Sequence, residues 1–310
     1  MTDFLVIGES VADIVRTPGR DDVPHPGGSP ANVAYGLARL GHDASLLTQL
    51  GADRMGELIA AHLRSAGVRL LSDGQQHVRT PTAVVTLDGG GHAEYAFDID
   101  WTLRPTQPPS TPRHVHLGSI AAVKQPGAET TAALAESLRG RATVSYDPNV
   151  RIELMGAHGE AVRRVERCVA LSDLVKASDE DLAWLYPGLP VPEVADRWLA
   201  LGPALVLVTR GGDGASAFVL SDGAAKEVAS PAVPTTVVDT VGAGDSFMSA
   251  TLDALAALDL LGAPARPGLA ALTAPALDRV LTHAGRAAAV TVSRAGANPP
   301  DRQELQDPTL

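Results

Sequence analysis

The feature that most constrains the fold is the regular alternation of short β-rich runs with segments of helical periodicity. The run at 4–8 is apolar throughout, as in strands buried on both faces of a parallel sheet. Similar runs recur along the chain, separated by apolar residues at helical spacing. This alternation predicts an α/β fold, a doubly wound parallel sheet flanked by helices. The expected strands are 4–8, 44–50, 114–119, 142–147, 174–178, 204–209 and 214–220, and later expected helices are 130–138, 161–170, 193–201 and 277–292.

Polar and glycine residues follow the ends of many of these strands. In doubly wound sheets, ligands bind at the carboxyl ends of the strands, so such residues are expected to converge on one site. That so many strands end in such residues is stronger evidence for a ligand site than any one of these residues alone. The residues at these ends are Gly8, Gly51, Gly118, Ser119, Asp147, Asn149, Lys176, Thr209, Arg210, Gly211 and Asp239.

The stretch from 239 to 247, D-T-V-G-A-G-D-S-F, predicts a strand at 235–238, a glycine turn and the start of a helix. Gly242 and Gly244 allow close approach of the backbone to a ligand. The free amides and the dipole at a helix start favour an anion. Asp245 lies at the same place and could accept a proton, a combination that suits phosphoryl transfer to a hydroxyl. The simpler alternative is that Asp245 caps the helix.

A second glycine motif occurs near the N-terminus, where H-P-G-G-S-P-A-N at 25–32 leads into a helix. The glycine pair again allows the backbone to approach a neighbouring group closely. The side-chain amide of Asn32 can both donate and accept hydrogen bonds. The alternative is a glycine loop with Pro30 in the first turn of the helix.

Two β-rich runs, 82–87 and 93–99, are joined by D-G-G-G at 88–91 and predict a β-hairpin. The hairpin interrupts the alternation, so we expect it to project from the main sheet. A flap of this kind could exclude water during group transfer. It could also be a dimer contact, and the two roles are compatible.

Composition excludes several classes of function. The 310 residues carry a formal net charge of −11, and no basic run suggests a track for nucleic acid. The single cysteine, Cys168, excludes an intrachain disulfide and a multi-cysteine zinc site, and its helical pattern places it in the core. No apolar run has membrane length and no signal-peptide pattern opens the sequence, so we expect a cytoplasmic protein without a membrane partner.

The nucleotide-binding motifs of other folds do not fit. There is no G-x-x-x-x-G-K-[ST] loop, and Phe247 occupies the place where a dinucleotide fingerprint requires a third small residue. The two glycine motifs instead resemble the two signatures of the ribokinase-like (PfkB) carbohydrate kinases. Within that family, G-G-S-P-A-N at 27–32, L-G-S at 117–119, Y-D-P-N-V-R at 146–151 and K-A-S-D-E-D at 176–181 look most like bacterial fructokinases.

The resemblance implies one ribokinase-like domain over 1–310, with a small β-lid formed by about 11–26 and 78–102. It implies transfer of the ATP γ-phosphate, with Mg²⁺, to a sugar hydroxyl. Asp245 would be the base, and the amides of Gly242, Ala243 and Gly244 would form the anion hole. The implied sugar ligands are Asp13, Gly27, Gly28, Asn32 and Asp245, and the implied nucleotide ligands are Asn149, Arg151, Lys176, Ser178, Thr209, Gly211, Gly214 and Gly244.

The resemblance also implies metal sites. Asp181 would reach Mg²⁺ through water, while Asp239, the carbonyl of Val241 and the backbone near Gly296 resemble the family's monovalent-cation site, which K⁺ would fill. Three departures stand out. The family's Asn-x-x-Glu motif is Ser178-x-x-Asp181 here, Gly285 replaces an Asn that is frequent near the adenine, and Pro300 stands where Ser can line the cation site.

We therefore expect an ATP-dependent sugar kinase that converts fructose to fructose 6-phosphate. The alternatives inside the family are 2-keto-3-deoxygluconate kinase, ribokinase and nucleoside kinase, because short pocket substitutions decide among them. A phosphosugar is disfavoured because the lid and the first loop lack a cluster of Lys or Arg. The alternative from another class is a non-catalytic sugar-binding regulator on a kinase fold. The expected partners are the sugar and ATP, with no nucleic acid, and a homodimer formed through the lid.

Overall fold

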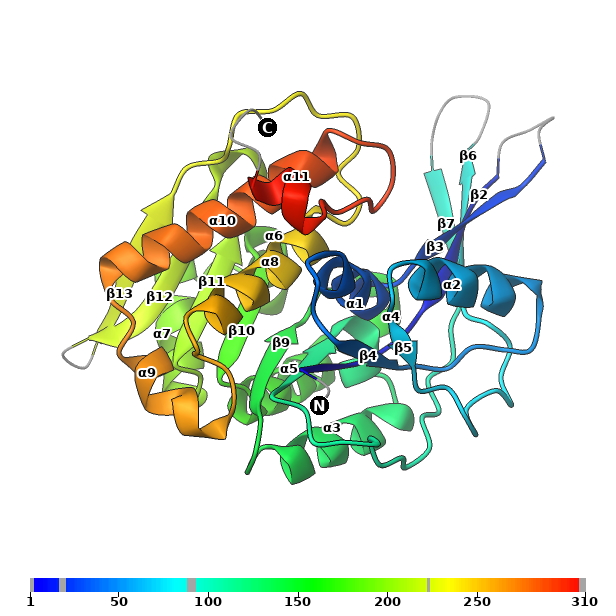
Figure 1. Ribbon diagram of the computed structural model, residues 1–310, viewed down its shortest axis with the longest axis horizontal. Coiled ribbons are helices and arrows are strands. Elements are labelled where there is room, and N and C mark those ends of the chain that lie inside the picture. The colour runs from blue at the N-terminus through cyan, green and yellow to red at the C-terminus, as the bar shows by residue number, and fades with distance from the viewer. Residues whose placement is uncertain (1–2, 17–20, 88–92, 222–223, 307–310) are drawn as a thin grey trace.

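The computed structural model describes residues 3–16, 21–87, 93–221 and 224–306. Its centre is a nine-stranded sheet with the order β13-β12-β11-β10-β9-β8-β1-β4-β5 (Figure 1). This confirms the predicted α/β fold. The strands are β1 (Phe4–Ile7), β4 (Ala44–Leu47), β5 (Arg69–Leu70), β8 (His114–Gly118), β9 (Thr143–Asp147), β10 (Leu174–Ser178), β11 (Leu205–Thr209), β12 (Ala215–Ser221) and β13 (Ala224–Ser230).

Strand β1 is the point from which the sheet grows in two directions. It pairs in parallel with β4 on one side and with β8 on the other, so that Phe4 aligns with both Ala44 and His114. The chain then continues in parallel through β9, β10 and β11, and only β12 and β13 pair antiparallel at the far edge. The carboxyl ends of β1 and β8 therefore flank the crevice in which such sheets bind their ligands.

Helices cover both faces of this sheet, and each face has its own hydrophobic cluster. Apolar residues at helical spacing explain why these segments are helices, as in α10, where Leu277, Leu281 and Ala284 are all buried. One face carries α1 (Ser29–Arg39), α2 (Arg54–Ser65), α8 (Ala243–Ala257) and α10 (Ala274–Val292); the other carries α3 (Gly127–Leu138), α5 (His158–Leu171), α6 (Asp179–Leu185) and α7 (Val191–Leu201). The shorter helices are α4 (Ile152–Met155), α9 (Arg266–Ala270) and α11 (Arg302–Gln306).

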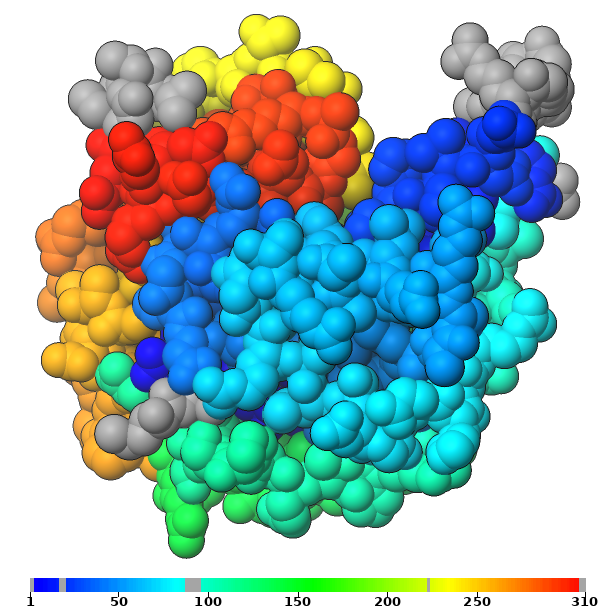
Figure 2. All heavy atoms as spheres, turned by 45° about the vertical axis from the view of Figure 1, so that its right-hand side comes forward, coloured from blue at the N-terminus to red at the C-terminus, as the bar shows by residue number. Residues whose placement is uncertain are grey.

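A separate four-stranded sheet, which we call the lid sheet, stands apart from the main body (Figure 1). Its strands are ordered β3-β2-β6-β7 and comprise β2 (Val11–Arg16), β3 (Val23–Gly27), β6 (Thr82–Leu87) and β7 (Ala93–Asp98). Val11, Ala83 and Ile99 form a small apolar cluster with Ile120 of the main body. Figure 2 shows the early lid strands, in dark blue, projecting beyond the helices that cover the main sheet.

The predicted hairpin is confirmed by the antiparallel pairing of β6 with β7, from Thr82↔Asp98 to Leu87↔Ala93. The segment before Pro26, for which no strand was predicted, contains β3, which pairs with β2. Its exposed edge position and two prolines hide the strand from a hydrophobic pattern. Residues 17–20 and the turn 88–91, both within predicted lid segments, lie outside the described residues.

The strand predicted at 235–238 is wrong, because this segment is irregular. The amides of Val238 and Asp239 both donate to the carbonyl of Val292 at the end of α10, at 2.7 and 3.2 Å. The segment thus runs beside a helix rather than in the sheet, and Val237 and Val238 are exposed. β-propensity alone could not reveal that these backbone groups would bond to the end of a helix. Strand β13 and helix α11 were also not predicted.

The buried histidines of β8 are strand residues, as predicted. His114 and His116 both bond to the hydroxyl of Ser145 on β9, at 2.7 and 2.8 Å. Burial lowers the pKa of both side chains, that of His116 to about 3, so they are neutral. Among the described helices, none combines enough length with enough apolar character to cross a membrane.

Candidate active site

Helix α8 begins at the glycine turn that the sequence singled out. Gly242 is its N-cap residue and adopts a left-handed conformation with φ 76°, which glycine accepts without strain. The amide of Ala243 donates to the Thr240 carbonyl at 3.3 Å. For the amides of Gly242 and Gly244 the described part of the chain offers no acceptor. These two amides and the helix dipole form a place where an anion can bind.

Asp245 lies in the first turn of α8 and does not cap it. Its carboxylate accepts the hydroxyl of Ser29 at 2.6 Å and the side-chain amide of Asn32 at 2.8 Å. Both donors lie on the first turn of α1, more than 200 residues earlier in the chain. The capping alternative is therefore not observed. Ser29 was not singled out from the sequence, although its spacing of three residues from Asn32 places both on one face of a helix.

Asp245 borders a polar cavity of about 450 Å³ between the main body and the lid sheet. Predicted sugar ligands Asp13, Gly28 and Asn32 line it, together with the turn 240–244. Asn149, Arg151 and Lys176, predicted along the nucleotide, also line this cavity. The remaining lining residues are Glu9, Val11, Ser29, Ala83, Phe97, Ile99, Ser119, Ile120, Leu154 and Glu180.

Two glycines allow close packing at the lid, one against Asp13 and the other against the backbone of Glu9. A Cβ at Gly27 would lie 1.9 Å from a carboxylate oxygen of Asp13. A Cβ at Gly28, where φ is 97°, would lie 2.7 Å from the carbonyl oxygen of Glu9. Burial raises the pKa of Asp13 to about 6, although Arg151 and His25 oppose the shift. The carboxylate is thus ionised at neutral pH and available to accept hydrogen bonds from hydroxyl groups.

A buried ion pair lies beneath the anion site. The ammonium of Lys176 bonds to Asp147 at 2.9 Å, and a Cβ at Gly244 would lie 2.8 Å from Lys176 Nζ. Burial raises the pKa of Asp147 to about 6. Burial opposes the charge of Lys176, but Asp147 and Asp181 outweigh it and raise the pKa of the ammonium. Both groups are therefore charged at neutral pH, and a positive charge lies next to the glycine turn.

A second cavity, of about 530 Å³, is mostly apolar and lies on the other side of the turn. The predicted nucleotide ligands Thr209, Gly211 and Gly214 line it. The two cavities share Thr240, Ala243 and Gly244. Gly285, noted for its departure from the family pattern, also faces this cavity. Most of its lining was missed in the sequence, namely Gly212, Ala215, Pro231, Ala232, Val233, Pro234, Thr235, Val237, Phe247, Leu281, Ala288, Ala289 and Val292.

Ser178 and Asp181 form a capping box at the start of α6. The two oxygens of Asp181 accept the amides of Val150 and Ser178, each at 2.8 Å. Asp181 thereby ties α6 to the loop after β9, and its neighbour Glu180, rather than Asp181, lines the polar cavity. The described residues contain no cluster of three His, Cys, Asp or Glu side chains that could hold a metal alone.

Asp239, Val241 and Gly296 lie together, although 57 residues separate the first from the last. Asp239 accepts the amide of Val241 at 3.0 Å and that of Gly296 at 2.8 Å. These bonds lower the pKa of Asp239, so its carboxylate is a fixed negative charge at this place. A carboxylate oxygen is a ligand that suits a hard cation.

Comparison with known proteins agrees with this geometry. The profile described as pfkB family carbohydrate kinase matches residues 1–304. A fructokinase of Klebsiella pneumoniae is 34% identical over 313 residues, covering 97% of both chains. The structure of a Xylella fastidiosa fructokinase with bound ATP has a TM-score of 0.84 at 25% identity and covers 98% of this chain and 97% of that one.

A further similar structure is a fructokinase double mutant from Vibrio cholerae O395 with fructose, ADP and a potassium ion bound. It has a TM-score of 0.77 at 26% identity and covers 100% of this chain and 96% of that one. Fold and sequence together define a carbohydrate kinase that uses ATP as its phosphoryl donor. The chain belongs to the pfkB family of carbohydrate kinases.

Glu9 is a polar-cavity residue that the sequence did not single out beyond its position after β1. Its side chain is buried and accepts the amide of Ala121 at 3.1 Å. Burial raises the pKa of Glu9 to about 7, although hydrogen bonds from Ser119 and backbone amides oppose the shift. The sequence feature that could have indicated Glu9 is the presence of a charged residue at the carboxyl end of the first buried strand.

We predict that Glu9 makes the protein less stable as pH rises. Between pH 4.5 and 7, the folded state retains a proton that the unfolded state has lost, so the unfolding free energy falls through this window. Glu9→Gln lacks this titration. Its unfolding free energy should rise relative to wild type by roughly 1–3 kcal/mol between pH 4.5 and 8 in urea melts.

Glu160→Gln is the matched control. Glu160 is solvent-exposed, and the hydrogen bond from Arg163, with the charge of Arg164, lowers its pKa, so any pH effect should have the opposite sign. A difference between Glu9→Gln and wild type that stays constant from pH 4.5 to 8 would contradict the raised pKa.

Proposed function

We propose that this kinase transfers the γ-phosphate of ATP to the 6-hydroxyl of fructose. The observation that carries the proposal is the position of Asp245 beside a turn shared by a polar and an apolar cavity. A sugar in the polar cavity and the adenosine of ATP in the apolar cavity would meet at Gly244. The acceptor hydroxyl would then lie near the carboxylate, and the γ-phosphate near the glycine turn.

Asp245 would act as the base. Its two hydrogen bonds come from neutral groups, the hydroxyl of Ser29 and the amide of Asn32, which orient the carboxylate without neutralising it. Negative charge that develops on the transferring phosphoryl group would meet the free amides of Gly242 and Gly244. The ammonium of Lys176 would add a positive charge beside them.

Mg²⁺ would accompany ATP and neutralise phosphate charge. The carboxylates that fit it are Glu180, which lines the polar cavity, and Asp181 through water. Asp181 already accepts two backbone amides, so its primary role in this proposal is to hold the loop at Val150. Few protein ligands are expected, because Mg²⁺ keeps several waters and binds the substrate's phosphates.

Fructose is favoured by the polar groups and by the relatives. Asp13 and Asn32 supply a carboxylate and an amide, which suit a polyol. The relatives described above at 34% and 25–26% identity are named fructokinases. A second candidate, 2-keto-3-deoxygluconate, is favoured by Arg151, which lines the same cavity and could pair with a substrate carboxylate.

We predict that Asp245→Asn lowers kcat by about 10²–10⁴-fold and leaves the sugar KM within a few-fold, because the base is lost while the pocket is retained. ADP release would be measured with Mg-ATP against fructose, ribose, 2-keto-3-deoxygluconate and adenosine. Asp13→Asn is the paired variant, in which we expect the main effect on the sugar KM. Unchanged turnover in Asp245→Asn would remove the base assignment.

The sugar panel also separates the rival functions. Turnover on fructose alone supports the proposal, whereas preference for 2-keto-3-deoxygluconate that Arg151→Met abolishes supports the second candidate. A wild-type protein that binds a sugar but phosphorylates none would favour the regulatory alternative.

We predict activation by K⁺ through Asp239. Asp239→Asn removes the fixed charge but retains a side chain of similar shape. Rates measured at constant ionic strength should rise when K⁺ replaces a large organic cation in wild type, and should not respond in Asp239→Asn. A wild-type rate that is independent of K⁺ would contradict the cation site.

We predict that the lid sheet pairs two subunits. Val15 and Val23, which face each other in register on β2 and β3, are 41% and 52% exposed. A second lid would cover them. Sedimentation across a wide range of concentration should show a dimer that Val15→Lys weakens. A strictly monomeric wild-type mass would exclude this contact.

A further inference from the structure

The loop 293–301, which joins α10 to α11, packs against the glycine turn at 242–244. A Cβ on Gly242 would lie 2.6 Å from Cβ of Ala297, so the two backbones are in close contact. The Gly296 amide also bonds to Asp239 at 2.8 Å. The position of the Gly242 amide therefore depends on where this loop lies.

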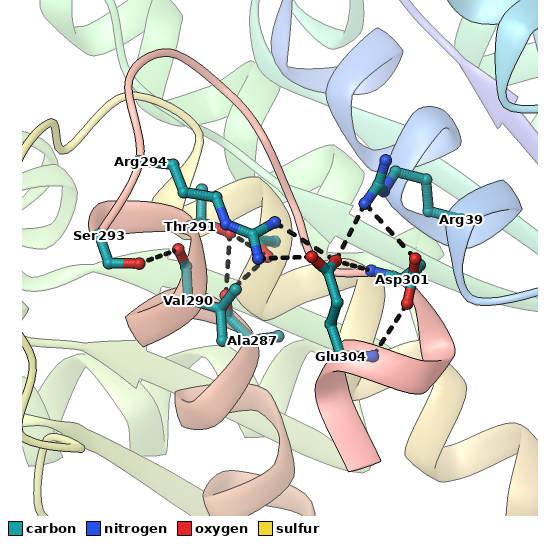
Figure 3. A network of polar contacts seen from close by, with 9 residues as sticks. Arg39, Ala287, Val290, Thr291, Ser293, Arg294, Asp301 and Glu304 are labelled. Atoms are coloured by element: carbon teal, nitrogen blue, oxygen red, sulfur yellow. Dashed lines mark hydrogen bonds and ion pairs between the residues drawn. The ribbon is translucent and has the colours of Figure 1, made fainter. Parts of the chain in front are cut away.

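Hydrogen bonds and ion pairs among a group of charged residues join the two ends of the loop. Glu304 of α11 accepts two bonds from Arg294, at 2.7 Å through Nη2 and 3.3 Å through Nη1 (Figure 3). The same carboxylate accepts the Asp301 amide, and the Glu304 amide returns to the Asp301 side chain, each at 2.9 Å. The end of α10 and the start of α11 are thus joined by one carboxylate.

Glu304 also reaches a third element. Arg39, in the last turn of α1, donates to it at 3.0 Å, as Figure 3 shows. The first turn of the same helix carries Ser29 and Asn32, which hold Asp245. A single rigid helix therefore connects this carboxylate to the predicted base.

We propose that Glu304 is a positioning residue that fixes the anion hole relative to the base. We call Arg39, Arg294, Asp301 and Glu304 the C-terminal clamp. Through Arg294 the clamp holds the loop behind Gly242, and through Arg39 it holds the helix that orients Asp245. This inference rests on the proposed function, because it assigns the turn 242–244 to phosphoryl transfer.

The clamp suits this task because it is a bidentate, partly buried network. The side chains of Arg39, Arg294 and Glu304 are 22–31% exposed. Arg294 donates through both Nη atoms to the two oxygens of the carboxylate, and such a bidentate pairing fixes direction as well as distance. Hydrogen bonds lower the pKa of Glu304, first among them the one from Arg294, so the clamp is charged at neutral pH.

A second contact supports the same coupling. Thr291 of α10 donates to the hydroxyl of Ser246 at 2.7 Å, and Ser246 donates to the Ala287 carbonyl at 3.1 Å. Ser246 follows Asp245 directly in α8. Helices α8 and α10 are thus held together beneath the base, and the clamp adds a constraint on the loop above them.

The experiment compares Glu304→Ala, Glu304→Gln and wild type by steady-state kinetics on the sugar that wild type phosphorylates. Glu304→Ala should lower kcat by about 10-fold or more and leave the sugar KM within about 3-fold, because small misplacement of transition-state groups reduces kcat selectively. Glu304→Gln keeps the shape of the side chain but not its charge, so its kcat should lie between those of Glu304→Ala and wild type. If Glu304→Ala fails to fold, the kcat of Glu304→Gln relative to wild type tests the proposal.

Glu166→Ala is the matched control. Glu166 is similarly buried and accepts Arg197 at 2.8 Å and the hydroxyl of Tyr186 at 3.0 Å, on the other face of the sheet. It should lose stability without a selective loss of kcat.

Amide hydrogen exchange supplies a readout that does not depend on turnover. Exchange at the hydrogen-bonded amides of the turn, those of Val241 and Ala243, should be faster in Glu304→Ala than in Glu166→Ala or wild type. Equal exchange in the three proteins, or an unchanged kcat in Glu304→Ala, would overturn the inference. Absence of sugar phosphorylation in wild type would instead overturn the proposed function, and the exchange result would still decide whether the clamp holds the turn.

Discussion

The structure depends on a meeting of two helix N-termini across the carboxylate of Asp245. Ser29 and Asn32 bring the start of α1 to the start of α8. The approach is possible because Gly8 follows β1, and a Cβ at Gly8 would lie 2.2 Å from the ring of Pro30. The central strand, the first helix and the helix with the predicted base thus form one packed unit, and both cavities are arranged around it.

Burial determines the electrostatics of this unit more than the net charge does. Glu9, Asp13 and Asp147 all have a raised pKa because they are withdrawn from water. Lys176 provides the buried positive charge that stabilises Asp147 in its ionised form. An acidic chain can therefore present amides and an ammonium to a polyphosphate at one place, since the local field outweighs the overall charge.

The sequence predicted the α/β fold, the hairpin and the residues of the glycine turn, because these features rest on local patterns. The prediction failed where the secondary structure of a segment depends on the element to which it hydrogen-bonds. The segment 235–238 has strand composition but hydrogen-bonds to the end of α10, and β3 lacks an apolar stripe because it is an edge strand. Only spacing and strand position marked Ser29 and Glu9, and nothing local marked Glu304 as a partner of both Arg39 and Arg294.

The local sequence sets the chemistry that is available: a carboxylate after a Gly-Ala-Gly turn, a second glycine motif with Asn32, and a lysine, Lys176, at the end of a strand. Only the tertiary structure decided how these groups are distributed. It placed Arg151 and Lys176 at the polar cavity, gave both oxygens of Asp181 hydrogen bonds from backbone amides, and placed Ala297 against Gly242. The physical reason is that periodicity and spacing report on neighbours along the chain, whereas hydrogen bonds and burial at this site join residues more than 200 positions apart.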